Sequence, residues 1–205
     1  RGVDELDSTS VSPATAGWQD YWDSSLDIEE IKIGVPREYF IHGLNPEIEK
    51  NIKSVISKLE KEGVKIEEIS LPYSEWALAT YYIIMPAEVS ANFARFDGIK
   101  YGRSIINKEE KLQNLFDVYL RTRGENFGAE VRRRIMLGTY ALSAGYYDAY
   151  YTRAQKVRRL IKQDFDRAFN PSTGGVDVII TPTSPTTAFK FGEKTQDPLS
   201  MYLAD

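Results

Sequence analysis

Cysteine is absent from the 205 residues, and histidine occurs once, at His42. The absence of cysteine excludes disulfides, zinc–thiolate sites and cysteine nucleophiles. A single histidine leaves almost no room for a histidine-based catalytic triad or a histidine metal cluster. Several of the most familiar hydrolytic and metal-dependent sites are therefore excluded.

Long apolar runs and an excess of positive charge are also missing. No stretch approaches the roughly 20 apolar residues that would span a bilayer. The 26 basic and 30 acidic residues give a net charge of −4, which argues against tight nucleic-acid binding by this chain alone. No phosphate-binding loop, dinucleotide fingerprint or HExxH motif occurs. The chain begins at Arg1 with no charged-then-apolar leader, which predicts a soluble protein whose own beginning is missing.

The clearest regular pattern is a strand, a helix and a second strand in succession. A β-rich run spans Ile31–Val35, and an alternating run, "VKIEEISLP", ends at Pro72. Between them lies a helical apolar stripe with Asn45 as N-cap, Pro46 at the first helical position and Gly63 at the end. Parallel pairing in a βαβ unit follows, so the predicted class is α/β.

The rest of the chain is predicted to be mostly helical. Expected helices cover residues 75–96, 116–121, 130–142 and 146–169, with a loop over 98–107 and a glycine-bearing break over 123–128. After "NPSTGG", the run "VDVIITPTSP" predicts a buried strand. Ser172 in that break could suggest a glycine-cradled nucleophile, but no base accompanies it, and a tight turn is favoured.

Three consecutive arginines, Arg132–Arg134, open an apolar helical segment. They are about 100° apart around a helix, so they cannot share one face. The predicted inward side is marked by Ile135, Leu137 and Ala141, and Arg134 flanks it. All three arginines could be solvated, or one could act as a fork for a carboxylate, and periodicity alone leaves both interpretations open. Most of the 13 tyrosines are expected to have a half-buried ring and a hydroxyl group in contact with solvent.

Six blocks, in order along the chain, resemble a known family: "DSTSV", "IKIGVPREYF", "EVSANFARFDGIKYG", "RRIMLGTYALSAGYYDAYYTRAQKVRRLIKQDF", "DVIITPTSPTTAF" and "DPLSMYLAD". They are similar to the amidase signature family and, within it, to the A subunits of glutamyl-tRNA(Gln) amidotransferases. The resemblance implies an amidase signature fold, a mixed β-sheet flanked by helices. Residues 1–205 would form part of a single amidase domain, as an internal to C-terminal fragment.

The resemblance also implies a chemistry without cysteine or histidine. A serine nucleophile, a second serine and a lysine base hydrolyse glutamine through an acyl-enzyme, and ammonia leaves. These residues precede the "DSTSV" block in the family, so the fragment itself is expected to be inactive, and Ser8 and Ser10 do not match the nucleophile. No cofactor or metal is implied for this chain. The B and C subunits complete a heterotrimer, in which the B subunit uses ATP and Mg²⁺ to amidate misacylated tRNA, in a bacterial cytoplasm or an organelle.

By motif position, Tyr81, Arg134 and Asp205 match the family's glutamine pocket. The implied roles are an ion pair between Arg134 and the α-carboxylate, an ion pair between Asp205 and the α-ammonium, and a wall or hydroxyl from Tyr81. Two alternatives stay open. One is a stand-alone amidase acting on another carboxamide, and the other is a noncatalytic interaction module that docks through the tyrosine-rich helix.

Overall fold

The computed structural model describes residues 3–7, 9–11, 27–40, 43–106 and 114–194. Its strands are β1 (Lys32–Pro36), β2 (Lys65–Ile69) and β3 (Val178–Ile179), which form one sheet in the order β2-β1-β3. β1 is paired in parallel with each of its neighbours. The predicted α/β class is confirmed, and all pairings between the described strands are parallel.

The predicted βαβ unit is present as β1, α1 (Pro46–Lys61) and β2. The Asn45 side chain accepts a hydrogen bond of 2.8 Å from the Glu47 backbone N–H, and Pro46 occupies the first turn. Gly63 has a φ of +93°, a conformation that favours glycine at a helix end. The 3₁₀ segments η2 (Ile28–Glu30) and η4 (Pro72–Trp76) flank the unit, and η3 (Arg37–Tyr39) lies between β1 and α1.

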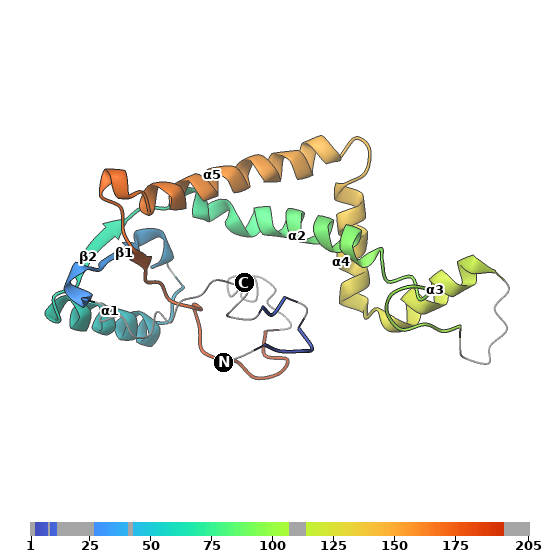
Figure 1. Ribbon diagram of the computed structural model, residues 1–205, viewed down its shortest axis with the longest axis horizontal. Coiled ribbons are helices and arrows are strands. Elements are labelled where there is room, and N and C mark those ends of the chain that lie inside the picture. The colour runs from blue at the N-terminus through green and yellow to red at the C-terminus, as the bar shows by residue number, and fades with distance from the viewer. Residues whose placement is uncertain (1–2, 8, 12–26, 41–42, 107–113, 195–205) are drawn as a thin grey trace.

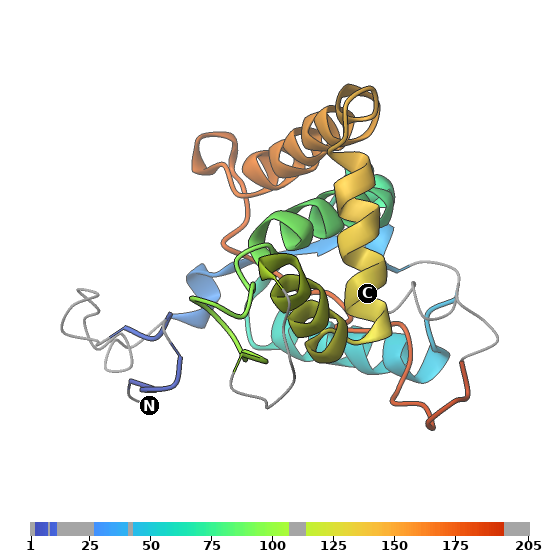
Figure 2. The same cartoon turned by 90° about the vertical axis from the view of Figure 1, so that its right-hand side faces the viewer.

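Three helices form a second region beside the sheet: α2 (Ala77–Phe93), α4 (Ala129–Ala141) and α5 (Arg153–Ala168). α5 lies alongside α2, and α4 crosses α2 (Figure 1, Figure 2). Buried residues of α2 include Ile84, Pro86 and Ala87. α2 contacts both α4 and α5 and is therefore the central helix of this region.

The crossing of α2 and α4 depends on a glycine. A Cβ atom added at Gly138 would lie 1.8 Å from the Pro86 carbonyl oxygen, so only glycine permits this backbone approach. Ala141 is also buried, but Leu137 is 52 % exposed. The prediction that Leu137 faces inward is therefore wrong, because the small residues of α4, rather than its large apolar ones, face α2.

α3 (Leu115–Asn126) lies at the far end of the molecule from the sheet (Figure 1). It continues through Gly124, so the predicted helix end at residue 121 is wrong. Arg123 Nη1 donates to the carbonyl oxygens of Phe93 and Phe96 at 2.8 and 3.2 Å. Arg123 also lies over the Phe127 ring at 4.8 Å. Anchoring on both sides of Gly124 outweighs the roughly 1 kcal/mol that a helical glycine costs.

The predicted long helix over 146–169 consists of a π-helical segment, η5 (Tyr147–Thr152), followed directly by α5. The chain then turns through η6 (Pro171–Thr173), where the Asn170 side chain accepts from Ser172 N–H at 3.0 Å. Gly174, with a φ of +77°, completes the tight turn that was predicted around Ser172. β3 is shorter than predicted, and Val178 is 45 % exposed, because β3 contacts a strand on one side only among the described residues.

Among the described residues, no helix is both long and apolar enough to cross a membrane.

Candidate functional site

Arg134 is the arginine of the triplet that turns toward α2. Its side chain is 30 % exposed, against 65 % for Arg133, and Arg132 is also exposed. Gly138 follows one turn later on the same face, at the closest approach to α2. The helix crossing therefore directs Arg134 toward α2, and Arg132 and Arg133 face outward.

The Arg134 guanidinium contacts side chains of both α4 and α2. Its Nε donates to Glu130 Oε1 at 2.9 Å, within α4. Its Nη1 lies 3.7 Å from the Met85 sulfur, and its Cζ lies 5.8 Å from the centre of the Tyr82 ring, both on α2. A carboxylate, a thioether and an aromatic ring therefore hold the guanidinium at the junction of the two helices.

Electrostatics keep this arginine charged. The hydrogen bond to Glu130 raises the pKa of Arg134 above its ordinary value, partial burial opposes that effect, and the neighbouring Tyr81 hydroxyl contributes in the same direction as Glu130. In return, the hydrogen bond from Arg134 holds the pKa of Glu130 below its usual range. The site thus presents a fixed positive charge that can pair with a carboxylate.

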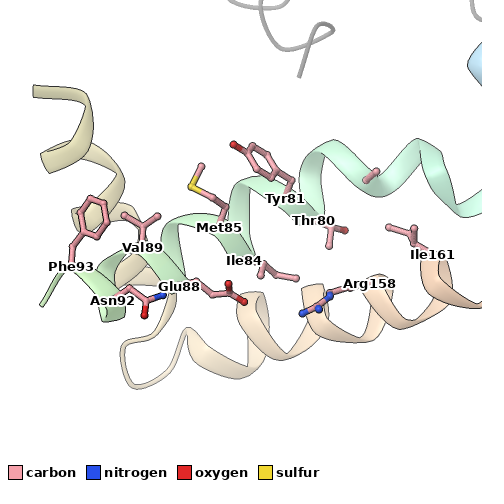
Figure 3. A pocket seen from close by; sticks show the side chains of 11 residues that line it. Thr80, Tyr81, Ile84, Met85, Glu88, Val89, Asn92, Phe93, Arg158 and Ile161 are labelled. Carbon is pink, nitrogen blue, oxygen red and sulfur yellow. The ribbon is translucent and has the colours of Figure 1, made fainter. Parts of the chain in front are cut away.

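Tyr81 stands at the rim of a groove of about 510 Å³ along α2 and α5. Figure 3 shows Tyr81 and Met85 projecting from α2 on the side away from α5, whereas Arg158 extends from α5 toward α2. The Tyr81 ring meets the Tyr82 ring edge-on, with centroids 5.1 Å apart. Tyr81 is 42 % exposed, so its hydroxyl can reach a ligand, while the Tyr82 ring supports the guanidinium.

The structure places the Tyr81 hydroxyl within hydrogen-bond reach of the Arg134 guanidinium. Asp205, the third predicted site residue, lies outside the described residues, as does His42. Sequence reasoning missed Tyr82, Met85 and Glu130. Glu130 could have been found, because it precedes Arg134 by four residues on one helix and carries the opposite charge. Met85 and Tyr82 reach Arg134 only through tertiary packing.

A tyrosine cluster lies at the other end of α4, where the chain turns into η5. The ring centroids of Tyr140 and Tyr146 are 4.3 Å apart, and those of Tyr146 and Tyr150 are 6.0 Å apart. The hydrogen bond between the hydroxyls of Tyr140 and Tyr146 raises the pKa of Tyr140 to about 12. All three rings are between 41 % and 49 % exposed, in agreement with the expectation of half-buried tyrosines.

No group of three His, Asp or Glu side chains in the described part of the chain could hold a metal ion. The polar chemistry of the site is instead one inward guanidinium with a tyrosine hydroxyl beside it.

A parallel sheet flanked by helices, with an arginine directed toward a helix junction, defines an α/β protein with a candidate anion-binding site. A family model described as "Amidase" matches residues 2–205, and the chain belongs to this family. It is 53 % identical over 205 residues to the A subunit of the glutamyl-tRNA(Gln) amidotransferase of Carboxydothermus hydrogenoformans. The corresponding protein of Thermodesulfovibrio yellowstonii is 52 % identical over 204 residues.

A solved structure supports the same assignment. The crystal structure of the A subunit of glutamyl-tRNA(Gln) amidotransferase from Thermotoga maritima matches 99 % of this chain with a TM-score of 0.59 and 35 % sequence identity. The matched region is 37 % of that chain. The sequence likewise matches over 100 % of its own length and covers 40 % of the two curated relatives, so it spans less than half of the proteins that it resembles.

Proposed function

We propose that this chain forms the glutamine-recognising part of the glutaminase subunit of a tRNA-dependent amidotransferase, within a single amidase domain. The observation that carries the proposal is the inward guanidinium of Arg134, which lies beside Tyr81 and is fixed by Glu130. A free amino acid differs from a simple carboxamide by its α-carboxylate and α-ammonium groups. The guanidinium of an arginine is a suitable partner for the α-carboxylate, because it can donate two parallel hydrogen bonds.

In this proposal Arg134 pairs with the α-carboxylate of glutamine, Asp205 pairs with the α-ammonium group, and the Tyr81 hydroxyl shapes the wall. These contacts place the side-chain carboxamide at a serine nucleophile supplied by a part of the full-length protein outside these 205 residues. The serine oxygen bonds to the carboxamide carbon, the C–N bond breaks, and the nitrogen leaves as ammonia after it takes up a proton. Water then releases glutamate and restores the serine. The 205 residues alone are expected to hydrolyse no glutamine.

The proposed partners are the B and C subunits of a heterotrimer. Ammonia passes to the B subunit, which uses ATP and Mg²⁺ to activate the side-chain carboxylate of Glu-tRNA(Gln), or of Asp-tRNA(Asn), for amidation. This assignment is supported by the identity of about half of all positions to named A subunits, over the whole chain.

The test is glutamine hydrolysis by the full-length protein in complex with the B and C subunits. Arg134→Ala should lower kcat/KM for glutamine by about 10³-fold, because it removes the charged partner of the carboxylate. It should spare a simple carboxamide without an α-carboxylate. Arg132→Ala is the matched control, since Arg132 lies on the exposed side of the same helix. Unchanged glutamine hydrolysis by Arg134→Ala would return the arginine triplet to the solvated face and leave the pocket assignment unsupported.

A further inference from the structure

The contacts of the Arg134 guanidinium with Glu130 and Met85 indicate which of its edges a carboxylate would take. A guanidinium can bind a carboxylate through Nε and one Nη, or end-on through both Nη atoms. The Nε atom already donates to Glu130 Oε1 at 2.9 Å. Nη1 faces the Met85 sulfur at 3.7 Å, and a thioether is a weak acceptor that a carboxylate readily replaces. The Tyr81 hydroxyl also hydrogen-bonds this guanidinium, so a carboxylate bound at the edge formed by Nη1 and Nη2 would have Tyr81 beside it.

Glu130 is well placed to maintain this arrangement. It lies in the first turn of α4, where the helix dipole favours a negative charge, and it precedes Arg134 by four residues. Its second oxygen pairs with Arg133, so the carboxylate is held from two sides. The pKa of Glu130 is lowered by the hydrogen bond from Arg134, and the carboxylate stays ionised over the neutral range.

The aromatic and thioether contacts complete the restraint. The Tyr82 ring lies 5.8 Å from Arg134 Cζ and Met85 contacts Nη1, and both residues belong to α2. Glu130 approaches from α4 itself. Rotation of the guanidinium about its long axis would break the Nε hydrogen bond, which joins Arg134 to an oppositely charged partner.

We propose that Glu130 is a positioning residue that holds Arg134 by Nε, so that the α-carboxylate of glutamine is bound end-on by Nη1 and Nη2. The inference rests on the proposed function and deepens it. Glu130 does not touch the substrate, and it acts through the orientation of Arg134.

The experiment compares Glu130→Ala and Glu130→Gln in the full-length protein in complex with the B and C subunits. Steady-state kinetics are measured with glutamine and with a simple carboxamide that lacks the α-carboxylate. Glu130→Ala should raise KM for glutamine about 10-fold with kcat within about twofold, because an unrestrained guanidinium binds the carboxylate less well. Glu130→Gln should raise KM by less than about threefold, because the amide oxygen still accepts from Nε.

Glu49→Ala is the matched control. Glu49 forms the same kind of pair, with Lys53 four residues later at 2.5 Å, on α1 and away from the site. It should leave both substrates unaffected.

Three results would overturn the proposal. The first is an unchanged KM for glutamine in Glu130→Ala while Arg134→Ala loses glutamine hydrolysis. This result would remove the positioning role of Glu130 and leave the proposed function intact. The second is an equal loss on both substrates in Glu130→Ala and Glu130→Gln, which indicates a general structural defect. The third is a neutral Arg134→Ala, which removes the proposed function together with the positioning role.

Discussion

The sheet region and the crossing of α2 with α4 are built on different rules. In β1–α1–β2, apolar periodicity, an Asn cap and a turn glycine specify the elements. The apolar residues of α1 form a half-buried stripe along one face of the helix. At the crossing, α4 presents Gly138 and Ala141 to α2 while Leu137 faces outward. Residue polarity is a sufficient guide in the first region, whereas residue size decides which face is buried in the second.

The difference matters for the site, because close approach of the two backbones is what brings Arg134 against Met85 and Tyr82. A larger residue at the crossing would separate the helices and withdraw both contacts. The sheet region, in contrast, can lose a surface contact without any change at the site.

The largest expected effect comes from Gly138→Ala, which would break the crossing. Its Cβ would meet the Pro86 carbonyl oxygen at 1.8 Å, and a backbone atom cannot rotate away. We expect a loss of about 3 kcal/mol in the free energy of unfolding, at the upper end of the usual cost of overpacking. Urea denaturation of the full-length protein measures it.

Gly124→Ala is the control for this substitution. Gly124 lies inside α3, and an added Cβ meets nothing within 4 Å. Alanine there should stabilise the protein by about 0.5–1 kcal/mol. Equal effects of the two substitutions would contradict the role assigned to the crossing.

The second largest effect is expected at the contact between α5 and η4, where the helices meet the segment that follows the sheet region. Asp164 of α5 is 1 % exposed, accepts a 2.7 Å hydrogen bond from the Tyr73 N–H of η4, and pairs with Arg167. Asp164→Ala leaves a part-buried donor without its partner and should cost about 2–3 kcal/mol. Asp166→Ala, which removes an exposed pair with Lys162, should cost less than about 0.5 kcal/mol. Thermal unfolding distinguishes the two, and similar losses would count against a structural role for Asp164.

The smallest of the three expected effects concerns Glu38, which lies in the sheet region. Although partial burial opposes its ionisation, hydrogen bonds from the Ser70 hydroxyl and the Leu71 N–H, at 2.6 and 2.9 Å, lower the pKa of Glu38 to about 2. Because the folded-state pKa lies below the unfolded value of about 4.5, the stabilisation is complete above that value and is lost as the pH falls toward about 2.

Glu38→Gln should therefore lose about 2 kcal/mol at pH 7, and the difference from the unsubstituted protein should shrink below pH 5. Urea midpoints at pH 7, 5 and 3.5 measure this difference. A gap that stays constant with pH would show that the carboxylate charge is not what stabilises η3 against the end of β2.

Much of the sheet region was predictable from the sequence because its signals are local. Asn45 and Gly63 mark the ends of α1 through the chemistry of capping, and the two runs around α1 have strand character. Parallel pairing then follows from connectivity. The helix end at residue 121 was misplaced because Gly124 is held in α3 by the contacts of Arg123 with distant carbonyl groups.

The site was predictable only in part. The 100° spacing showed that the three arginines must separate, and the resemblance selected Arg134, but neither showed what supports its guanidinium. Glu130 could have been predicted as a partner of Arg134 from its spacing of four residues on the helix. Met85 and Tyr82 were not, because their contacts depend on how closely α4 approaches α2, which a glycine decides.

The hydrogen bonds between Lys32 and the turn before β3 have a consequence during translation. Its backbone N–H bonds to the Asp177 carboxylate at 2.9 Å, and its Nζ bonds to the Gly174 carbonyl at 2.7 Å, across as many as 145 positions of sequence. At roughly 5–20 residues per second, a ribosome needs about 7–30 s to make that length of chain. β2 is available much earlier, so the other edge of β1 stays open for most of that interval. Nascent chains bearing this segment are therefore exposed to edge-to-edge association through β1 until β3 emerges and pairs with it.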